Sequence, residues 1–406
     1  MSAESEVDHP GEAALPGTLP EALRAELVEF RRDLHMHPEL GNQEFRTTAA
    51  IKARLEKAGL KPRVLAIGTG LICDIGEWDG GRPMLALRAD IDGLPIPDTK
   101  SECPYRSRVP DRAHACGHDV HTTVVLGAGL VLAELLKRGQ LPRPVRLIFQ
   151  PAEEVLPGGA ADVVECGVLD GVGRMLAVHC DPKVDAGKIG LREGAITSAC
   201  DRLEIALDGP GGHTARPHLT TDLVTAAARV VTDVPAIVAR RTDARSGLAV
   251  TWGRVESGHA PNVIPQHAEL SGTVRCLDLD TWRQAPDLVV AAIDEVANLH
   301  RAKSEINYVR GVPPVVNDPD ATELMRAAMA ARRGADSVEG TEQSLGGEDF
   351  SWYLEHVPGA MARLGVRLPG DRVGRDLHQG DFDVDESAIT VGVELFTAAA
   401  LIDSAG

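Results

Sequence analysis

Short apolar runs alternate with helix-like segments through the first half of this 406-residue chain. Each helix-like segment carries apolar residues at helical spacing, and each apolar run is short enough to be a buried strand. Strands and helices in alternation are typical of a mostly parallel sheet with helices on both faces. The predicted elements are the strand Met84–Leu87, the helix Asp119–Leu136, the strand Val145–Phe149, the helix Gly159–Cys166 and the strand Met175–Val178.

Two more helices are predicted before this alternation. Thr18 and Glu21 have the spacing of a capping box, which places the start of the first helix between them. The second helix runs from about Glu44–Ala58 and ends at Gly59, a common C-terminal signal. Residues 1–19 are polar and acidic, and we predict that they form a disordered tail.

The pattern changes near Ala195. Six elements then follow in the order strand, helix, strand, strand, helix, strand, which is the order of a ferredoxin-like α+β unit. They are predicted at Arg202–Leu207, Asp222–Ala239, Gly247–Val255, Ala268–Cys276, Thr281–His300 and Ser304–Val309. The α/β pattern resumes with helices at Asp320–Arg333 and Glu348–Glu355, a strand at Ala360–Leu364 and a helix at Glu386–Ile402. We therefore predict an α/β domain in two parts, residues 20–194 and 311–406, with an α+β domain of residues 195–310 inserted in it.

Charge and composition restrict the partners. Acidic residues outnumber basic ones, 60 against 42, so the formal net charge is −18. This field repels phosphate backbones and anionic lipids, which argues against nucleic acid and membrane surfaces as partners. Residues 1–19 lack the features of a signal peptide, and the apolar stretch Val124–Leu136 is too short to span a bilayer. The seven cysteines include no C-x-x-C pair, so we expect reduced thiols and a cytoplasmic protein.

Polar residues with metal-binding chemistry follow the predicted strands. Asp90 and Asp92 follow the first strand, Glu153 and Glu154 the second, and His179 the third. The carboxyl ends of parallel strands meet at one edge of a sheet, so these side chains are expected to lie together. Carboxylates and an imidazole at one sheet edge indicate a metal site.

Cys116 and His118 stand just before the long predicted helix, with Gly117 between them. A tight turn at the glycine would let both side chains point inward. Thiolate, imidazole and carboxylate ligands suit zinc or another late first-row divalent ion, and manganese is also compatible. Glu153 and Glu154 are neighbours, so on extended backbone they would point in opposite directions, one toward a metal and one toward a substrate.

Each of these signals also has a purely structural interpretation. A single cysteine is usually a small buried hydrophobic residue, a histidine after a strand is usually structural, and paired glutamates are usually solvated. His35 and His37, at the end of the first helix, are interpreted as structural. The chain has no G-x-S-x-G, Walker or H-E-x-x-H motif. The joint placement of the polar residues after successive strands is what favours a metal site.

Ten motifs, in this order, resemble those of the dinuclear metallo-amidohydrolases of the aminoacylase and glutamate-carboxypeptidase superfamily. The most similar branch contains hippurate hydrolases, bacterial N-acyl-amino-acid amidohydrolases and plant auxin-conjugate hydrolases. The resemblance covers residues 20–402 and implies a zinc-exopeptidase-like catalytic domain with an inserted lid or dimerisation domain. The motifs are HMHPELGNQE (35–44), RADIDGLPI (88–96), HACGHDVHT (114–122), FQPAEE (149–154), AVHCDP (177–182), GGHTARPH (211–218), NVIP (262–265), GTVR (272–275), GGEDFS (346–351) and LHQ (377–379).

The resemblance also implies roles for individual residues. Glu153 matches the catalytic base, and Asp90 matches an aspartate behind the metals that follows a histidine in other branches, where this chain has Arg88. His213 and Asn262 match positions that reach the carbonyl oxygen or carboxylate of the substrate. Cys116 stands where other branches have a bridging aspartate. Two divalent ions (zinc, manganese, cobalt or nickel) would be held by Cys116, His118, Glu154, His179 and His378.

The implied activity is hydrolysis of the amide bond of an N-acyl amino acid or a similar small conjugate. A metal-activated water would attack, with Glu153 as general base and acid and His213 as a donor to the oxyanion. Two alternatives stay open: a dipeptidase or carboxypeptidase on the same scaffold, and a non-catalytic metal-dependent binding protein. The inserted domain is expected to act as a lid, and its strand edge could pair with a second copy to form a homodimer.

Overall fold

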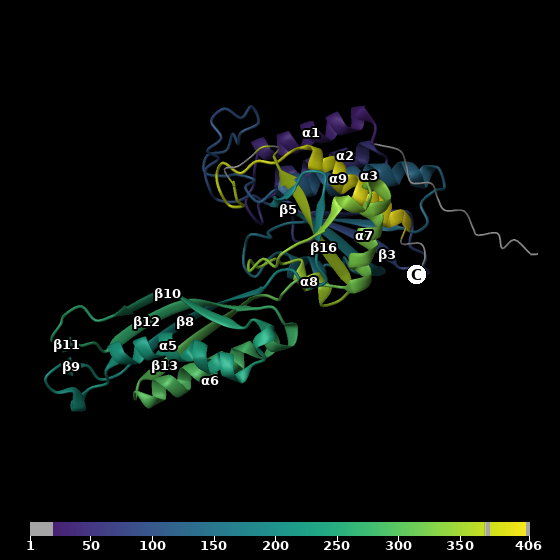
Figure 1. Ribbon diagram of the computed structural model, residues 1–406. Coiled ribbons are helices and arrows are strands. Elements are labelled where there is room, and N and C mark those ends of the chain that lie inside the picture. Colours follow the sequence, from purple (N-terminus) through teal and green to yellow (C-terminus); the bar gives the residue numbers. More distant parts are fainter. Residues whose placement is uncertain (1–18, 369, 371–373, 403–406) are drawn as a thin grey trace, which may run out of the picture.

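The computed structural model describes residues 19–368, 370 and 374–402, which form two bodies joined at a narrow waist (Figure 1). The larger body contains an eight-stranded sheet in the order β1–β2–β4–β3–β5–β16–β6–β15. The strands are β1 (Arg63–Val64), β2 (Leu71–Ile75), β3 (Met84–Asp90), β4 (Val145–Gln150), β5 (Val172–Asp185), β6 (Ile189–Leu191), β15 (Val338–Gly340) and β16 (Gly359–Arg367). The four central strands β4, β3, β5 and β16 run parallel, which confirms the predicted mostly parallel sheet.

Both faces of this sheet are covered, so every residue of β3 and β4 is buried. Alternate side chains of β3 face opposite sides: Leu85 and Leu87 pack into one core cluster, and Met84 and Ala86 into another. The first cluster includes helices α1 (Glu21–Met36), α2 (Phe45–Lys57), α3 (His118–Lys137), α7 (Pro319–Arg333) and α9 (Ser387–Ile402). The second includes the short helices α4 (Ala160–Glu165) and α8 (Ser351–Leu354).

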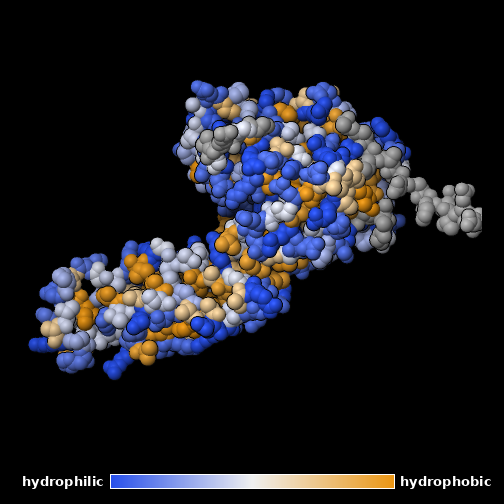
Figure 2. Space-filling view, viewed as in Figure 1, coloured by the Kyte–Doolittle hydropathy of each residue, from blue (hydrophilic) through white to orange (hydrophobic). Residues whose placement is uncertain are grey.

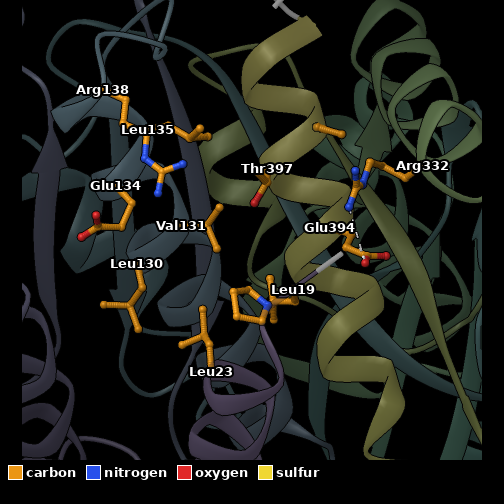
Figure 3. Close-up of a pocket in the computed structure, with 12 residues that line it drawn as sticks. Leu19, Leu23, Leu130, Val131, Glu134, Leu135, Arg138, Arg332, Glu394 and Thr397 are labelled. Carbon is orange, nitrogen blue, oxygen red and sulfur yellow. Dashed lines mark ion pairs between the residues drawn. The ribbon is translucent and has the colours of Figure 1, made fainter. Parts of the chain in front are cut away.

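The helix α3 is largely buried. It is long and apolar enough to cross a membrane, but 83% of its apolar stretch is buried inside the protein, as in the core helix of a globular body. A pocket of about 250 Å³ lies between α1, α3, α7 and α9 (Figure 3). It is lined mainly by apolar residues, four of them leucines, together with Glu134, Arg138 and the ion-paired Glu394 and Arg332.

The smaller body is a four-stranded antiparallel sheet in the order β10–β12–β8–β13 with two long helices packed on it (Figure 1). Along β8, alternate residues such as Leu203, Ile205 and Leu207 are buried against these helices. Its elements follow the predicted order: β8 (Ala199–Asp208), α5 (Leu223–Arg241), β10 (Ala249–Ser257), β12 (His267–Cys276), α6 (Leu279–Leu299) and β13 (Lys303–Val312).

The chain enters and leaves the smaller body through two adjacent segments. The short strands β7 (Gly194–Ala195) and β14 (Val316–Asn317) pair antiparallel, with Ala195 opposite Val316. Apolar residues gather at the waist where the two bodies meet (Figure 2). At the opposite end of the smaller body, β9 (Gly212–His213) pairs with β11 (Val263–Ile264) (Figure 1).

Two predictions for the larger body were wrong in detail. The helix predicted over Glu348–Glu355 is a single turn, α8, because Glu348 and Asp349 instead turn inward as partners of the buried Arg88, at 3.1 and 2.7 Å. Leu19, assigned to the tail, is only 6% exposed and packs in the core.

The predicted start of the first helix is not confirmed by a side-chain cap. Helix α1 begins after Pro20 and has no side-chain cap. The remaining residues assigned to the tail, 1–18, and the predicted capping residue Thr18 lie outside the described residues.

Candidate metal centre

The polar residues that follow the central strands meet at one edge of the larger sheet. Asp90 is the last residue of β3, Gln150 is the last of β4, and His179 lies on β5. These strands are parallel neighbours, so their carboxyl ends share an edge. Cys116 and His118 reach the same edge from the start of α3, and their donor atoms lie within 4.8 Å of one another and of a ring nitrogen of His179.

Gly117 lets its two neighbours face this centre. Its φ is +87°, and a Cβ on it would lie 2.7 Å from the sulfur of Cys180. Only glycine fits this left-handed turn against a neighbouring side chain. Cys116 and His118, on either side, are 5% and 1% exposed. The tight turn therefore buries both candidate ligands at the start of α3.

His118 is oriented by one ring nitrogen and free at the other. Nδ1 lies 3.0 Å from the backbone oxygen of Asp92 and 3.2 Å from its Oδ1, and donates there. Nε2 is buried without a hydrogen-bond partner and lies 3.8 Å from carboxylate oxygens of Asp90, Glu153 and Glu154. Burial lowers the pKa of His118, but Asp90, Asp92 and Glu154 outweigh it and raise the pKa to about 10. A buried nitrogen surrounded by carboxylates is a place for a cation.

His179 and Cys116 form the other side of the centre. Nδ1 of His179 donates to the backbone oxygen of Cys180 at 2.8 Å, so Nε2 is left to face the Cys116 sulfur at 3.5 Å. Burial lowers the pKa of His179 well below its ordinary value, which keeps the ring in the neutral form that binds metals. Burial, with Glu154 and Glu153 close by, raises the pKa of the Cys116 thiol well above its ordinary value. A thiolate here therefore needs a bound cation.

Two groups of donor atoms share the Cys116 sulfur. One is Cys116, His118 and His179, the other is Cys116, Glu154 and His378, and each group lies within 4.8 Å. Nε2 of His378 is 3.3 Å from Oε1 of Glu154. The backbone N–H of His378 donates to the oxygen of Ala115 at 2.8 Å, which ties this loop to the segment before Cys116. A sulfur with a donor group on either side can bridge two cations, so the residues present fit two divalent ions.

Glu153 and Glu154 do not point in opposite directions, and that prediction was wrong. The strand β4 ends at Gln150, and the chain turns at Ala152, whose φ is +59°. Both carboxylates therefore lie 3.8 Å from Nε2 of His118. They differ in charge state. Burial, with Glu348 and Glu154 nearby, raises the pKa of Glu153 well above its ordinary value, whereas the hydrogen bond from His378 and the charge of His118 overcome burial and lower the pKa of Glu154. Two adjacent acids thus have different roles available to them.

Asp90 is held from behind by a buried network. Its carboxylate accepts from Nη1 of Arg88 at 2.8 Å and from Nδ1 of His121 at 2.7 Å. Nε2 of His121 accepts from the backbone N–H of Cys180 at 2.8 Å, so both nitrogens of this ring are occupied. His121 is therefore a support and not a free ligand. Arg88 also donates to Gln150 at 2.8 Å.

A cavity of about 410 Å³ opens onto this centre. One wall carries Cys116, Glu153, Glu154, His179 and His378. The smaller body also contributes to the lining, through Cys200, Arg275 and Val312. By contrast, no histidine, cysteine or aspartate lines the pocket of Figure 3 among the described residues, so that pocket is not a metal centre.

The family model for Peptidase family M20/M25/M40 matches residues 86–402, about three quarters of the chain. The chain belongs to this family. Membership accounts for the paired donor groups, because a solved family structure, the Bacillus subtilis YXEP protein, is described as a dinuclear metal binding peptidase. That structure has a TM-score of 0.82 and 34% identity, and the match covers 95% of this chain and 99% of the other.

Curated relatives in the family include enzymes and a longer protein. A protein named N-acetylcysteine deacetylase from Bacillus subtilis (strain 168) is 37% identical over 383 residues, which cover 94% of this chain and 97% of the relative. A Rhodococcus jostii (strain RHA1) protein named "Putative glutamate--cysteine ligase 2-3" is 48% identical over 372 residues. That match covers 92% of this chain but 46% of the relative, so the chain spans about half the length of that protein.

His213 and Asn262 are brought together, but not at the metal centre of their own chain. Both are exposed, and they lie at the β9–β11 pair, at the end of the smaller body that is remote from the larger one (Figure 1). The N–H of Thr214 donates to the oxygen of Asn262 at 3.2 Å. The predicted contact of these residues with a substrate is therefore not made within this arrangement of one chain.

Sequence reasoning missed the buried supports of the centre. His121 and Gln150 stand inside motifs of the resemblance, but nothing in their spacing marks them as partners of Asp90 and Arg88. Arg363 lines the cavity from β16 and was also missed, because it lies in an apolar strand outside every motif.

Proposed function

We propose that this chain is a metal-dependent amidohydrolase that cleaves the amide bond of small N-acyl amino acids. The observation that supports this most is the position of Glu153. Its carboxylate lines the cavity 3.8 Å from His118, yet it belongs to neither of the donor groups that share Cys116. Glu153 does lie close to His118 and Glu154, and to Glu348 and Asp349, but neither group that contains the Cys116 sulfur includes it. A buried acid beside those two groups is placed to move protons.

Two divalent ions would be held by the five predicted ligands, Cys116, His118, Glu154, His179 and His378. When bound, such ions lower the pKa of a water molecule and polarise the carbonyl of the scissile amide. The sulfur and imidazole donors favour zinc, and manganese, cobalt and nickel are the other candidates.

Glu153 would accept a proton from the attacking water at its carboxylate and return it to the leaving nitrogen. Its raised pKa suits a group that must carry a proton between two steps near neutral pH. Asp90, which accepts hydrogen bonds from Arg88 and His121, would stay ionised through both steps and keep its negative charge close to His118.

The substrate class is supported by the cavity and by the relatives. A cavity volume of about 410 Å³ suits a small conjugate better than a protein chain. The relative named N-acetylcysteine deacetylase, with 97% of its length matched, supports an N-acyl amino acid. All seven cysteines lie among the described residues and are free thiols, which supports a reducing cytoplasm as the place of action.

We further propose that His213 acts in a homodimer. It is too far from the metal centre of its own chain to touch a substrate there, and β10 and β13 are open edges of the smaller sheet that can pair with a second copy. Mixing Glu153→Gln with His213→Ala tests this. Hybrid dimers would hold one complete site, so the equilibrated mixture of two weak variants should regain about a quarter of the wild-type activity. No regain would leave closure of the smaller body, as a lid, to bring His213 in.

The function itself is tested with a substrate panel. N-acyl amino acids, dipeptides and simple amides would be assayed with zinc, manganese, cobalt and nickel in turn. Cleavage of N-acyl amino acids above the other classes is expected. Cleavage of dipeptides alone would indicate a dipeptidase, and a metal-loaded protein inert toward the whole panel would indicate a binding protein.

A further inference from the structure

Arg363 is a cation in the wall of the metal-centre cavity. It lies on β16 directly opposite His179 of β5 in the parallel pairing, and it lines the cavity together with Cys116 and Glu153. It is 6% exposed. Arg363 also lines a second cavity, together with Asp181 and Ser344.

Among the described residues, no carboxylate forms a direct ion pair with this guanidinium, and the charges of Asp181 and Glu348 act on it only from a greater distance. Nη2 of Arg363 is buried with no hydrogen-bond partner, and the side chain of Arg363 makes no hydrogen bond or ion pair with the described residues. The other fully buried arginine at this edge, Arg88, pairs instead with three carboxylates, those of Asp90, Glu348 and Asp349. An unpaired buried cation is costly for a fold, so its retention points to a partner that arrives from outside.

A second arginine in the same cavity is already engaged. Arg275, at the base of the smaller body, donates from Nη1 to the backbone oxygen of Leu345 at 2.7 Å. Of these two cavity arginines, Arg363 is the one with a buried N–H group that has no hydrogen-bond partner. Its planar fork of N–H groups matches a carboxylate in two parallel hydrogen bonds.

We propose that Arg363 binds the α-carboxylate of the substrate and so selects N-acyl amino acids over neutral amides. This proposal rests on the proposed amidohydrolase function. In such a substrate the carboxylate is attached to the carbon next to the scissile nitrogen, so it must be received within a few ångströms of the metal ligands. Arg363 has that position, because its neighbour across the sheet is His179.

Arg363→Met tests the proposal with two matched substrates, an N-acetyl amino acid and its carboxamide, which lacks the negative charge. The wild-type protein should favour the acid. The variant should raise KM for the acid by about 30-fold to 1000-fold, the usual range for removing one partner of a buried charge pair, and leave the amide unchanged. The ligand-free variant should have a Tm no lower than wild type, because an unpaired buried charge has been removed.

Two controls sharpen the result. Arg367→Met changes an arginine on the same strand that is half exposed and paired with Asp185. This variant should change KM for neither substrate. Arg275→Met removes the rival cation. The proposal is overturned if Arg363→Met keeps the wild-type preference for the acid over the amide, or if it raises KM for both substrates equally. It is also overturned if only Arg275→Met abolishes that preference.

A binding measurement separates this proposal from the proposed function. Calorimetry of the metal-loaded Glu153→Gln protein with the N-acetyl amino acid should show binding that is lost in Glu153→Gln/Arg363→Met. If the wild-type protein cleaves no amide but this binding difference is found, the amidohydrolase function fails and the carboxylate site stands. If both proteins bind the acid equally, the carboxylate site fails.

Discussion

Arg88 and Asp90, two residues apart on β3, form an ion pair of 2.8 Å in which neither side chain is more than 1% exposed. The same aspartate holds His121 at 2.7 Å and lies 3.8 Å from the free nitrogen of His118. The guanidinium therefore supports a candidate metal ligand from behind, at a position where other branches of the superfamily have a histidine. This makes Arg88 a structural requirement of the centre without giving it a place among the ligands.

Arg88→Met is expected to lower the free energy of unfolding by about 3–5 kcal/mol, because it leaves buried carboxylates unpaired. Urea denaturation of the metal-free protein at neutral pH measures this loss. Arg367→Met is the matched control, since its ion pair with Asp185 is about half exposed and contributes at most about 1 kcal/mol. Equal losses in the free energy of unfolding would show that the buried ion pairs of Arg88 stabilise the fold no more than an exposed pair does.

The two neighbouring glutamates should separate in function. Glu153→Gln is expected to lower kcat by about 10²–10⁴-fold while the metal content stays at two ions per chain, because in the proposed function Glu153 transfers protons and does not hold a metal. Glu154→Gln should lose metal together with activity, because Glu154 completes the group with Cys116 and His378. Elemental analysis beside the rate assay decides the assignment, and the opposite pattern would exchange the two roles.

Glu153 also predicts a pH dependence of stability in the metal-free protein. Burial raises its pKa well above 4.5, so above that pH the folded chain holds a proton that the unfolded chain has lost. Its contribution to stability is therefore fully present below the unfolded pKa and declines as the pH rises. Between about pH 5 and 8, wild type should lose more stability than Glu153→Gln in urea denaturation with a chelator present. Parallel stability curves for the two proteins would contradict a raised pKa.

The Cys116 thiol should lose its proton when metal binds. Its pKa is raised by burial and by Glu154 and Glu153, so it is protonated in the metal-free protein at neutral pH. Zinc addition at about pH 7.5 should therefore release about one proton more from wild type than from Cys116→Ala, measured with a pH indicator in weak buffer. Cys180→Ala is the control, because Cys180 is equally buried but lies in neither donor group that shares Cys116. Equal release from wild type and Cys116→Ala would remove the sulfur from the metal site.

Much of the fold could be predicted because it depends on local pattern. The apolar run Met84–Leu87 is buried on both faces, and such runs identify a covered parallel strand directly. The helix over Glu348–Glu355 failed for a reason that is not local. Glu348 and Asp349 are held by Arg88, more than 250 residues away in the chain, and that contact stops a longer helix from forming.

Glu153, Glu154 and His179 could be predicted for the same reason, since residues after parallel strands converge at one edge, whereas His378 was identified only from the resemblance to the family. The directions of the side chains could not be predicted. Glu153 and Glu154 were expected on extended backbone, but the left-handed turn at Ala152 brings both to the same side. The position of His213 depends on the orientation of the smaller body relative to the larger one (Figure 1). The spacing of residues in the sequence does not determine that orientation.

The antiparallel pairing of Ala195 with Val316 has a consequence for how this architecture can be rearranged. Two antiparallel neighbours can be joined by a tight turn of about two residues. A short turn could therefore replace the 120 residues between them in the chain, at the cost of core residues such as Ile196 and Val315, which lie at the two ends of that stretch. An exchange at this junction would replace only four residues of the cavity wall, Thr197, Cys200, Arg275 and Val312, because all five candidate metal ligands lie outside the exchanged stretch.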